Sequence, residues 1–301
     1  MPGSAIARND ASFFDGANAD MLARMATWFI TGCSTGLGRA LATTVLKRGE
    51  TVVLTARNPA AIEDLAKSYP DTSLALALDV TDDAQRRKAV DSALRRFGSI
   101  DVLVNNAGHG YRAAVEEASD EQVRELFATN FFGPVALIQE VLPSMRERRT
   151  GTIVTISSGG VRSCPIGAGH YVATKAALEA LTTSLGKEIE PLGIAVMAVE
   201  PGAFRTDYKR SLTQVRQTIN AYRDTVGVRR EEDLTEHDSQ PGDPARAAEA
   251  IITAVRSPAP PRLLVLGPDA LAWWHRSVEE LSADVDAWRH TSLSTSFPER
   301  S

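Results

Sequence analysis

The sequence predicts an α/β protein with a single doubly wound domain, in which a seven-stranded parallel sheet carries helices on both faces. From Thr27 onward, short β-rich runs alternate with helical patterns, so consecutive strands are joined by crossover helices. Such crossovers make the strands parallel. The strands are continuous apolar runs rather than alternating ones, as burial on both faces of a sheet requires.

The expected elements follow from apolar patterns and stop signals. The first strand, 28–32, runs into a glycine, and the helix after it, 37–49, ends at Gly49. The sixth strand, 194–202, ends at a Pro-Gly pair. The other strands are expected at 51–56, 74–80, 100–108 with its turn, 151–157 and 262–267, and the other helices at 59–69, 82–98, 119–147, 168–190 and 244–257.

Three segments differ in pattern from the rest of this domain, which covers residues 27–267. Residues 1–26 lack the apolar stretch of a signal peptide and are expected to form a disordered arm. Residues 203–243 are polar, charged and too long for an ordinary connection, so they are expected to form a substrate lid. Residues 268–301 form a helical extension, whose tryptophans 273, 274 and 288 are expected to pack on the domain or on a partner subunit.

The composition excludes several classes of function. The chain is 43% hydrophobic and 24% charged, with a net charge of −5, and no Lys/Arg cluster dominates a segment, so nucleic acid is not an expected partner. The basic run 146–149 ends a predicted helix, where cations suit the helix dipole. No apolar run is long enough for a membrane span. Cys33 and Cys164 make neither a disulfide framework nor a metal-ligand spacing, which favours a cytoplasmic protein without a metal site.

A glycine cluster lies where the first strand becomes the first helix. Gly32, Gly36 and Gly38 let the backbone turn tightly and approach a pyrophosphate, and the helix N-terminus supplies N–H groups and the positive end of its dipole. The position at the head of a βαβ repeat favours a dinucleotide site over a plain tight turn.

Arg57 follows the second strand, where NAD-binding folds usually carry an acid for the ribose hydroxyls. A carboxylate would repel a 2′-phosphate, whereas a guanidinium can bind it in a fork. The sequence therefore favours NADP(H) over NAD(H), with Arg57 as the main anchor and Ser34 as a helper. The alternative for Arg57 is a solvated turn residue.

Tyr171 and Lys175 lie four residues apart in a predicted helix, on one face and about one turn apart. The ammonium favours phenolate and lowers the pKa of the phenol toward the working pH, so the pair can transfer a proton. Ser157 and Ser158 end the strand before this helix, and a hydroxyl there can hold a substrate oxygen against the phenol. By itself such a pair is more often a helix surface.

These motifs together resemble the short-chain dehydrogenase/reductase family, in its form with a TGxxxGxG glycine loop and a YxxxK active site. They occur in the family's order over residues 27–267, and Ser158 precedes Tyr171 by the usual 13 positions. The motifs are TGCSTGLG at 31–38, Asp79 after the third strand, NNAG at 105–108, Asn130 in ATNFFG, Ser158, YVATK at 171–175 and the Pro-Gly pair at 201–202. The resemblance implies a Rossmann-type domain.

The resemblance also implies roles. Tyr171 would act as general acid in carbonyl reduction and as base in alcohol oxidation, and Ser158 would hydrogen-bond the substrate oxygen. Lys175 would assist Tyr171 and bind the nicotinamide ribose, and Asn130 would hold a water that connects Lys175 to solvent. By sequence alone Asn130 is an unremarkable helix residue, and Asp79 can equally be a cap or turn residue. The implied cofactor site comprises Gly32, Ser34, Thr35, Gly36, Leu37, Gly38, Arg57, Asp79, Val80, Asn106, Ala107, Gly108, Tyr171, Lys175, Pro201, Gly202 and Thr206.

The substrate is expected to be a small-molecule carbonyl or alcohol, a hydrophobic or ring-containing ketone or secondary alcohol in particular. The expected pocket is apolar with a few polar points, and it comprises His109, Tyr111, Gly159, Cys164, Pro165, Phe204 and Tyr208. Two alternatives stay open: an epimerase or dehydratase that recycles its cofactor, and a non-catalytic dinucleotide-binding regulator. The family resemblance implies pairing through 119–147 and the Tyr/Lys helix, and a homodimer is favoured over a tetramer because the extension would obstruct a second interface.

Overall fold

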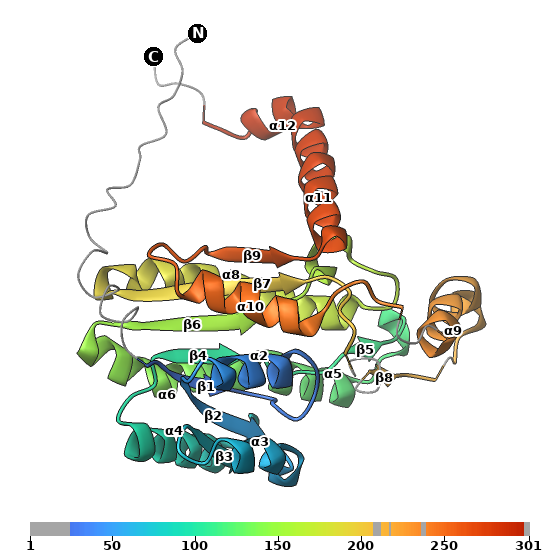
Figure 1. The fold of residues 1–301 in the computed structure, drawn as a ribbon. Helices are drawn as coiled ribbons and strands as arrows, with labels where there is room; N and C mark the ends of the chain where they lie inside the picture. Colours follow the sequence, from blue (N-terminus) through green and yellow to red (C-terminus); the bar gives the residue numbers. More distant parts are fainter. Residues whose placement is uncertain (1–24, 207–211, 217, 236–238, 298–301) are drawn as a thin grey trace.

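The computed structural model describes residues 25–206, 212–216, 218–235 and 239–297 (Figure 1). The expectations for residues 1–24 and for Tyr208 lie outside the described residues. Within them, the predicted fold class is confirmed: seven parallel strands form one sheet with helices on both faces.

The sheet has the order β3-β2-β1-β4-β6-β7-β9. Because the chain adds β2 and β3 on one side of β1 and the later strands on the other, a crevice opens beyond the carboxyl ends of β1 and β4. The strands are β1 Thr27–Ile30, β2 Thr51–Ala56, β3 Ser73–Ala77, β4 Val102–Asn105, β6 Gly151–Ile156, β7 Ile194–Pro201 and β9 Leu263–Leu266.

Alternate residues of each central strand enter two separate cores. In β1, Trp28 and Ile30 pack toward helices α2 (Gly36–Lys47) and α10 (Pro244–Val255), while Phe29 packs toward the opposite layer. That layer consists of α4 (Asp83–Phe97), α6 (Gly133–Arg148) and α8 (Gly169–Ile189). Both faces of the sheet are thus apolar, which explains the continuous apolar runs of the sequence.

The prediction of one regular α-helix over 119–147 is wrong. The structure has α5 (Asp120–Phe127), a π-helical turn η4 (Ala128–Phe132) and then α6. The helix expected at 59–69 likewise begins as a 3-10 turn, η2 (Pro59–Ile62), before α3 (Glu63–Ser68). Single π turns inside α-helices are frequent at functional sites, and this one carries Asn130.

The segment 203–243, expected to be a lid, contains local structure in its described parts. Strand β8 (Thr213–Gln214) pairs in parallel with β5 (Tyr111–Arg112) in a small second sheet. The remaining short elements of the described residues are η3 (Val115–Glu117), α7 (Gly160–Ser163), η5 (Glu190–Leu192), η7 (Asn220–Tyr222), the π-helical η8 (Arg223–Gly227) and α9 (Val228–Thr235).

The C-terminal extension forms α11 (Pro268–Ala287) and α12 (Arg289–Leu293), and Figure 1 shows α11 standing out from the domain. Its first turns contact α7, where Trp273 lies against Gly159, whereas Trp288 is 67% exposed. Among the helices of the described residues, none is long and apolar enough to cross a membrane.

Candidate active site

Tyr171 and Lys175 lie on the first turns of α8, facing the end of β6. Lys175 is buried, and its Nζ donates to the carbonyl oxygen of Ile156 at 2.8 Å. The same nitrogen lies 6.0 Å from the centroid of the Tyr171 ring. Burial lowers the pKa of Lys175 from 10.5 to about 8, so the side chain is still a cation at pH 7. The structure therefore places an ammonium beside the phenol.

Ser158 comes two residues after the end of β6 and is half-buried. Its Oγ accepts a hydrogen bond from the N–H of Gly160 at 3.0 Å. This bond fixes the oxygen at the start of α7, and the hydroxyl hydrogen can then be donated to a substrate oxygen.

Asn130 connects the loop after β4 to the Tyr/Lys helix. Its Nδ2 donates to the carbonyl oxygen of His109 at 3.0 Å and to Thr174 Oγ1 at 3.2 Å, and its Oδ1 accepts from the His109 N–H at 3.1 Å. The side chain is fully buried. Thr174, which sequence reasoning missed, gives no signal beyond its place inside the YxxxK motif.

Gly108 lets this loop pass close to two of the candidate catalytic residues. A Cβ there would lie 3.0 Å from Asn130 Oδ1 and 3.4 Å from Lys175 Nζ. Gly108, Asn130 and Lys175 thus meet at one point, although they come from three separate segments.

The glycine loop has the geometry that a pyrophosphate needs. Gly32 and Gly36 have φ of 72° and 59°, a region that favours glycine. A Cβ on Gly38 would clash with Asn106 and with the carbonyl of Gly32. At the start of α2, Thr35 makes no side-chain cap and the first turn holds no acid, so its N–H groups are open to an anion. The residues present fit a dinucleotide.

Thr31 and Asn106 bind the glycine loop to the loop after β4. Thr31 Oγ1 accepts from the N–H groups of Asn106 and Ala107, both at 2.9 Å. Asn106 Nδ2 donates to the carbonyl of Thr31 at 2.8 Å. Thr31 was missed as a site residue, although its place directly before Gly32 was a usable signal.

Arg57 follows β2 directly, is exposed and has no ion-pair partner among the described residues. Arg39, the other cation close to the glycine loop in sequence, bonds to Asp64 and to the carbonyl of Ala61. Of these two arginines, Arg57 is the one whose guanidinium remains available for a phosphate.

Asp79 caps the turn that leaves β3. Its Oδ1 accepts from the N–H of Thr81 at 2.9 Å and from Thr81 Oγ1 at 2.7 Å. The neighbouring Val80 is buried, and its carbonyl accepts from Arg86. These contacts match the turn role that the sequence left open, and the cofactor contacts of Asp79 and Val80 stay a prediction.

The Pro201-Gly202 segment is held by β9 and by the extension. Gly202 N–H donates to the Leu266 carbonyl at 2.8 Å, and Ala203 N–H donates to Asp269 Oδ2 at 2.7 Å. Asp269 was missed, because nothing in the sequence pairs it with a position 66 residues earlier. Thr206 lies over the glycine loop, since a Cβ on Gly36 would be 3.4 Å from the Thr206 Cβ.

The expected substrate residues occupy different environments. Tyr111 is buried, donates from its hydroxyl to Gln122 Oε1 at 2.9 Å and belongs to a small core on which Tyr171 packs. Phe204 packs on the main core and against Gly242. Gly159 is covered by the first turns of α11, Cys164 is exposed and Pro165 is half-buried. The contacts of these side chains with a substrate stay predictions.

Two histidines flank the site. Burial lowers the pKa of His109 and that of His170, so both imidazoles are neutral at pH 7. The His170 ring meets Tyr111 edge to face, with centroids 6.0 Å apart. These histidines are therefore neutral neighbours of the site.

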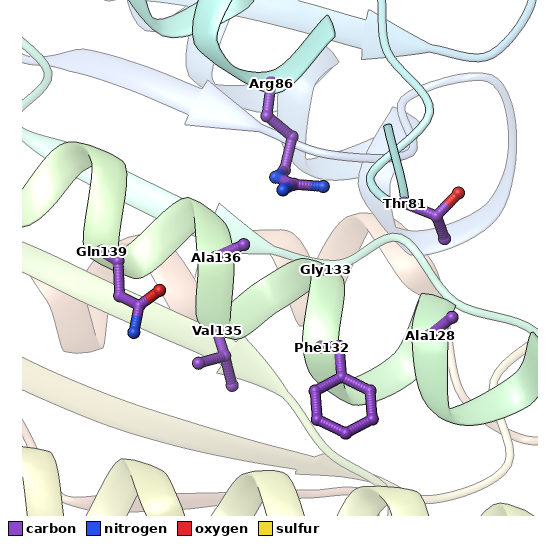
Figure 2. A pocket seen from close by; sticks show the side chains of 8 residues that line it. All are labelled: Thr81, Arg86, Ala128, Phe132, Gly133, Val135, Ala136 and Gln139. Atoms are coloured by element: carbon purple, nitrogen blue, oxygen red, sulfur yellow. The ribbon is translucent and has the colours of Figure 1, made fainter. Parts of the chain in front are cut away.

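The outer face of η4 and α6 bears a shallow hollow of about 420 Å³ (Figure 2). Figure 2 shows it between α6 and the segment that carries Thr81 and Arg86. Its lining does not include the candidate catalytic residues: it consists of Thr81, Arg86, Ala128, Phe132, Gly133, Val135, Ala136 and Gln139.

The doubly wound sheet carries a glycine loop at its crevice, and Ser158, Tyr171, Lys175 and Asn130 lie beside it. This combination is typical of dinucleotide-dependent oxidoreductases. Residues 26–217 match the family model for short chain dehydrogenases, and the chain belongs to this family. The resemblance seen in the sequence is confirmed.

Similar proteins support this assignment along most of the chain. Oxidoreductase BOA17 of Botryotinia fuckeliana is 36% identical over 269 residues, which are 89% of this chain and 98% of that protein. A 3-ketodihydrosphingosine reductase of Bacteroides thetaiotaomicron is 35% identical over 242 residues, 79% of this chain and 87% of that protein. The crystal structure of a short-chain dehydrogenase from Streptomyces avermitilis is 41% identical, covers 91% of this chain and all of its own, and superposes with a TM-score of 0.86. Two further solved structures, each 26% identical with TM-scores of 0.65 and 0.67, hold 5-hydroxy-NADP and NADH.

Proposed function

We propose that this protein is an NADP(H)-dependent oxidoreductase that transfers a hydride between the nicotinamide and a hydrophobic or ring-containing ketone or secondary alcohol. The observation that carries the proposal is the meeting of Lys175, Asn130 and Gly108 beside Tyr171, at the crevice that the glycine loop lines. Such a group supplies a proton and a polarised oxygen where a nicotinamide would lie.

When bound, the cofactor would supply the hydride. In reduction, the Tyr171 hydroxyl gives its proton to the carbonyl oxygen, and the Ser158 hydroxyl donates a hydrogen bond to that oxygen as negative charge develops on it. The Lys175 ammonium stabilises the phenolate that remains. Asn130 holds the loop after β4 against α8 and so keeps Lys175 in place. In alcohol oxidation the same groups work in reverse.

The choice of NADP(H) rests on Arg57. Solved relatives hold both kinds of dinucleotide, so the family does not decide the matter. Arg57 is exposed after β2, where a 2′-phosphate would lie, and a guanidinium can bind a phosphate in a fork.

A hydrophobic substrate is supported by the relative from Bacteroides thetaiotaomicron, which is a reductase of 3-ketodihydrosphingosine.

The described part of 203–243 lies beside β5 through strand β8, which fits its proposed role as a lid. The cysteines are unpaired, which fits the cytoplasm. A homodimer through α5, α6 and α8 would cover the exposed Phe132 and the hollow of Figure 2.

The test is a screen of NADPH and NADH oxidation against ketones, aldehydes and ring carbonyls, repeated with Tyr171→Phe. The variant should lose most turnover, roughly a hundredfold or more, because it cannot give a proton. NADPH binding, measured by fluorescence, should stay nearly unchanged, and Tyr69→Phe, remote from the site, should behave as the native chain. Near-normal turnover in Tyr171→Phe would refute the assignment. Turnover of a substrate without net NADPH consumption would indicate an epimerase instead.

A further inference from the structure

The segment from Pro201 to Thr206 crosses the crevice in which the dinucleotide is proposed to lie. At one end, the carbonyl oxygen of Pro201 accepts a hydrogen bond at 2.8 Å from the N–H of Gly159, which directly follows Ser158 in the chain. At the other end, Thr206 lies over the glycine loop at Gly36. The segment therefore runs from the candidate catalytic residues to the place where a pyrophosphate would bind.

Two N–H groups of this segment are bound by elements that follow it far along the chain. The N–H of Gly202 donates to the carbonyl oxygen of Leu266 at 2.8 Å, and the N–H of Ala203 donates to Asp269 Oδ2 at 2.7 Å. The first bond joins two backbone groups and persists whatever side chain stands at 266. The second depends entirely on the side chain of Asp269, so a single substitution can remove it.

The start of α11 holds Asp269 firmly against the domain. Asp269 lies in the first turn of this helix, where the positive end of the helix dipole stabilises a carboxylate. The next residue, Ala270, is fully buried, and a Cβ on Gly159 would lie 3.1 Å from both Ala270 Cβ and Trp273 Cε3. The first turns of α11 are thus packed on the connection that carries Ser158, and this packing fixes the carboxyl group relative to that connection.

The second oxygen of this carboxyl group packs on the same segment. Asp269 Oδ1 is buried, and it occupies the space that a Cβ on Gly202 would need. The φ of Gly202 is not positive, so its backbone conformation alone does not require a glycine. The contact with Asp269 does require one. Both oxygens of Asp269 therefore restrict the segment, one through a hydrogen bond to Ala203 and one through close packing on Gly202.

We propose that Asp269 is a positioning residue for the nicotinamide end of the cofactor, which acts by holding Ala203 and with it the wall of the crevice. This inference rests on the proposed function, because it takes the dinucleotide to lie in that crevice. For hydride transfer the nicotinamide must lie beside Ser158 and Tyr171, and Asp269 holds the half of the segment that begins there. Asp269 lies beyond residues 26–217, which match the family model, so this role belongs to the extension of this chain.

The test compares two substitutions of Asp269 in the full chain. Asp269→Ala removes the acceptor, whereas Asp269→Asn keeps a carbonyl oxygen that can accept from the N–H of Ala203. In fluorescence titrations, Asp269→Ala should bind NADPH roughly tenfold more weakly than the native chain, and Asp269→Asn should restore most of the affinity. Asp286→Ala, which removes an exposed acid from the same helix, is the matched control and should bind NADPH as the native chain does.

A fragment of the cofactor separates positioning from a general loss of structure. 2′,5′-ADP lacks the nicotinamide half of NADPH, so calorimetry should give equal affinities for the native chain and Asp269→Ala. Without any ligand, hydrogen exchange of amides 202–206 should be faster in Asp269→Ala and near the native rate in Asp269→Asn. In the native chain, saturating NADPH should slow the exchange of the same amides, and this measurement needs no variant that folds.

Several outcomes would overturn the role of Asp269. They are equal NADPH affinity in Asp269→Ala and the native chain, an equal loss of NADPH and 2′,5′-ADP binding, a loss in Asp269→Asn as large as in Asp269→Ala, and exchange of amides 202–206 that NADPH does not change. Each of them leaves the proposed function standing, because the native chain still binds the dinucleotide. A native chain that binds neither NADPH nor NADH would refute the proposed function itself. If the native chain prefers NADH, the same comparison is made with NADH and ADP.

Discussion

At the scale of single residues, the candidate site is defined by which polar groups are already engaged and which remain available. Lys175, Asn130 and Thr31 are bound by neighbouring loops, so their positions are fixed before any ligand arrives. Arg57 is the opposite case, because it is exposed at the rim of the crevice. The candidate catalytic residues should tolerate little change, whereas exchange of Arg57 should leave the fold intact.

Exchange of Arg57 is expected to change cofactor preference. In Arg57→Asp, the carboxylate would repel a 2′-phosphate and could bind the ribose hydroxyls of NADH instead. A hydrogen bond to a charged group contributes about 1.5–3 kcal/mol, so the ratio of kcat/KM for NADPH to that for NADH should fall roughly ten- to a hundredfold.

Steady-state kinetics with both cofactors measure this ratio. Arg48→Asp is the control, because Arg48 follows α2 at its C-terminal end, away from the glycine loop at the other end of the helix. An unchanged ratio in Arg57→Asp would mean that Arg57 is only a solvated turn residue.

At the scale of elements, the strands of the sheet could be predicted from the sequence, whereas the contacts of the segments that cover the site could not. The strands were predictable because each one is an apolar run with a stop signal, and Gly32 and Gly49 lie two residues beyond the observed ends of β1 and α2. The π turn at Asn130 could not be predicted, because one extra residue in a turn does not show in a helical sequence pattern. Contacts such as Arg112 with Asp233 or Asp269 with Ala203 join distant positions, and local pattern does not encode them.

The described part of the proposed lid is held by buried ion pairs. Glu117 of η3 accepts from the N–H groups of Thr218 and Ile219, at 2.8 and 2.9 Å, and from Arg230 of α9 at 2.6 Å. Burial alone would raise the pKa of Glu117, but these N–H groups and the guanidinium lower it to about 2. A second buried pair joins Arg112 of β5 to Asp233 of α9 at 2.7 Å.

Loss of the Glu117 charge should loosen the described part of the proposed lid. In Glu117→Gln the buried Arg230 loses its counter-ion, so hydrogen exchange of amides 218–233 should become roughly tenfold faster or more. Glu121→Gln, at an exposed position in the first turn of α5, is the control. Because the pKa of Glu117 is lowered from 4.5 to about 2, its stabilising effect is complete above pH 4.5 and is lost as the pH falls toward 2. The difference in hydrogen-exchange rate between the native chain and Glu117→Gln should therefore be present at pH 6. Equal exchange rates at that pH would contradict the stabilising role of Glu117.

At the scale of the whole molecule, a buried cluster joins the three elements that carry the site. Arg162 of α7 contacts Glu200 of β7 at 2.5 Å and Glu179 of α8 at 3.0 Å. Ser158 precedes α7, Lys175 lies one turn before Glu179, and Pro201 follows Glu200 directly. Two buried carboxyl groups share one guanidinium, so one of the two is more stable in its protonated form than in its ionised form. Burial, with the neighbouring Glu200, raises the pKa of Glu179 to about 8.

This raised pKa predicts how the stability of the whole domain depends on pH. A carboxyl with a pKa of 4.5 when unfolded and about 8 when folded contributes stability that is complete below pH 4.5 and is lost as the pH rises to 8. One such group changes the free energy of unfolding by up to about 1.4 kcal/mol per pH unit in this window. Glu179→Gln keeps a hydrogen-bonding side chain that cannot ionise, so this part of the slope should disappear.

Urea unfolding of the native chain and of Glu179→Gln at pH 5, 6, 7 and 8 measures the effect. The two free energies should diverge as the pH rises, with the variant gaining on the native chain, because the neutral amide carries no charge into the buried cluster. Glu188→Gln, on the exposed side of the same helix, controls for a general effect of removing one acid from α8. Parallel pH profiles for the native chain and Glu179→Gln would mean that Glu179 is ionised in the folded protein. The cluster would then be a fully charged ion network, and α7, α8 and β7 would be joined by charge alone and not by a shared proton.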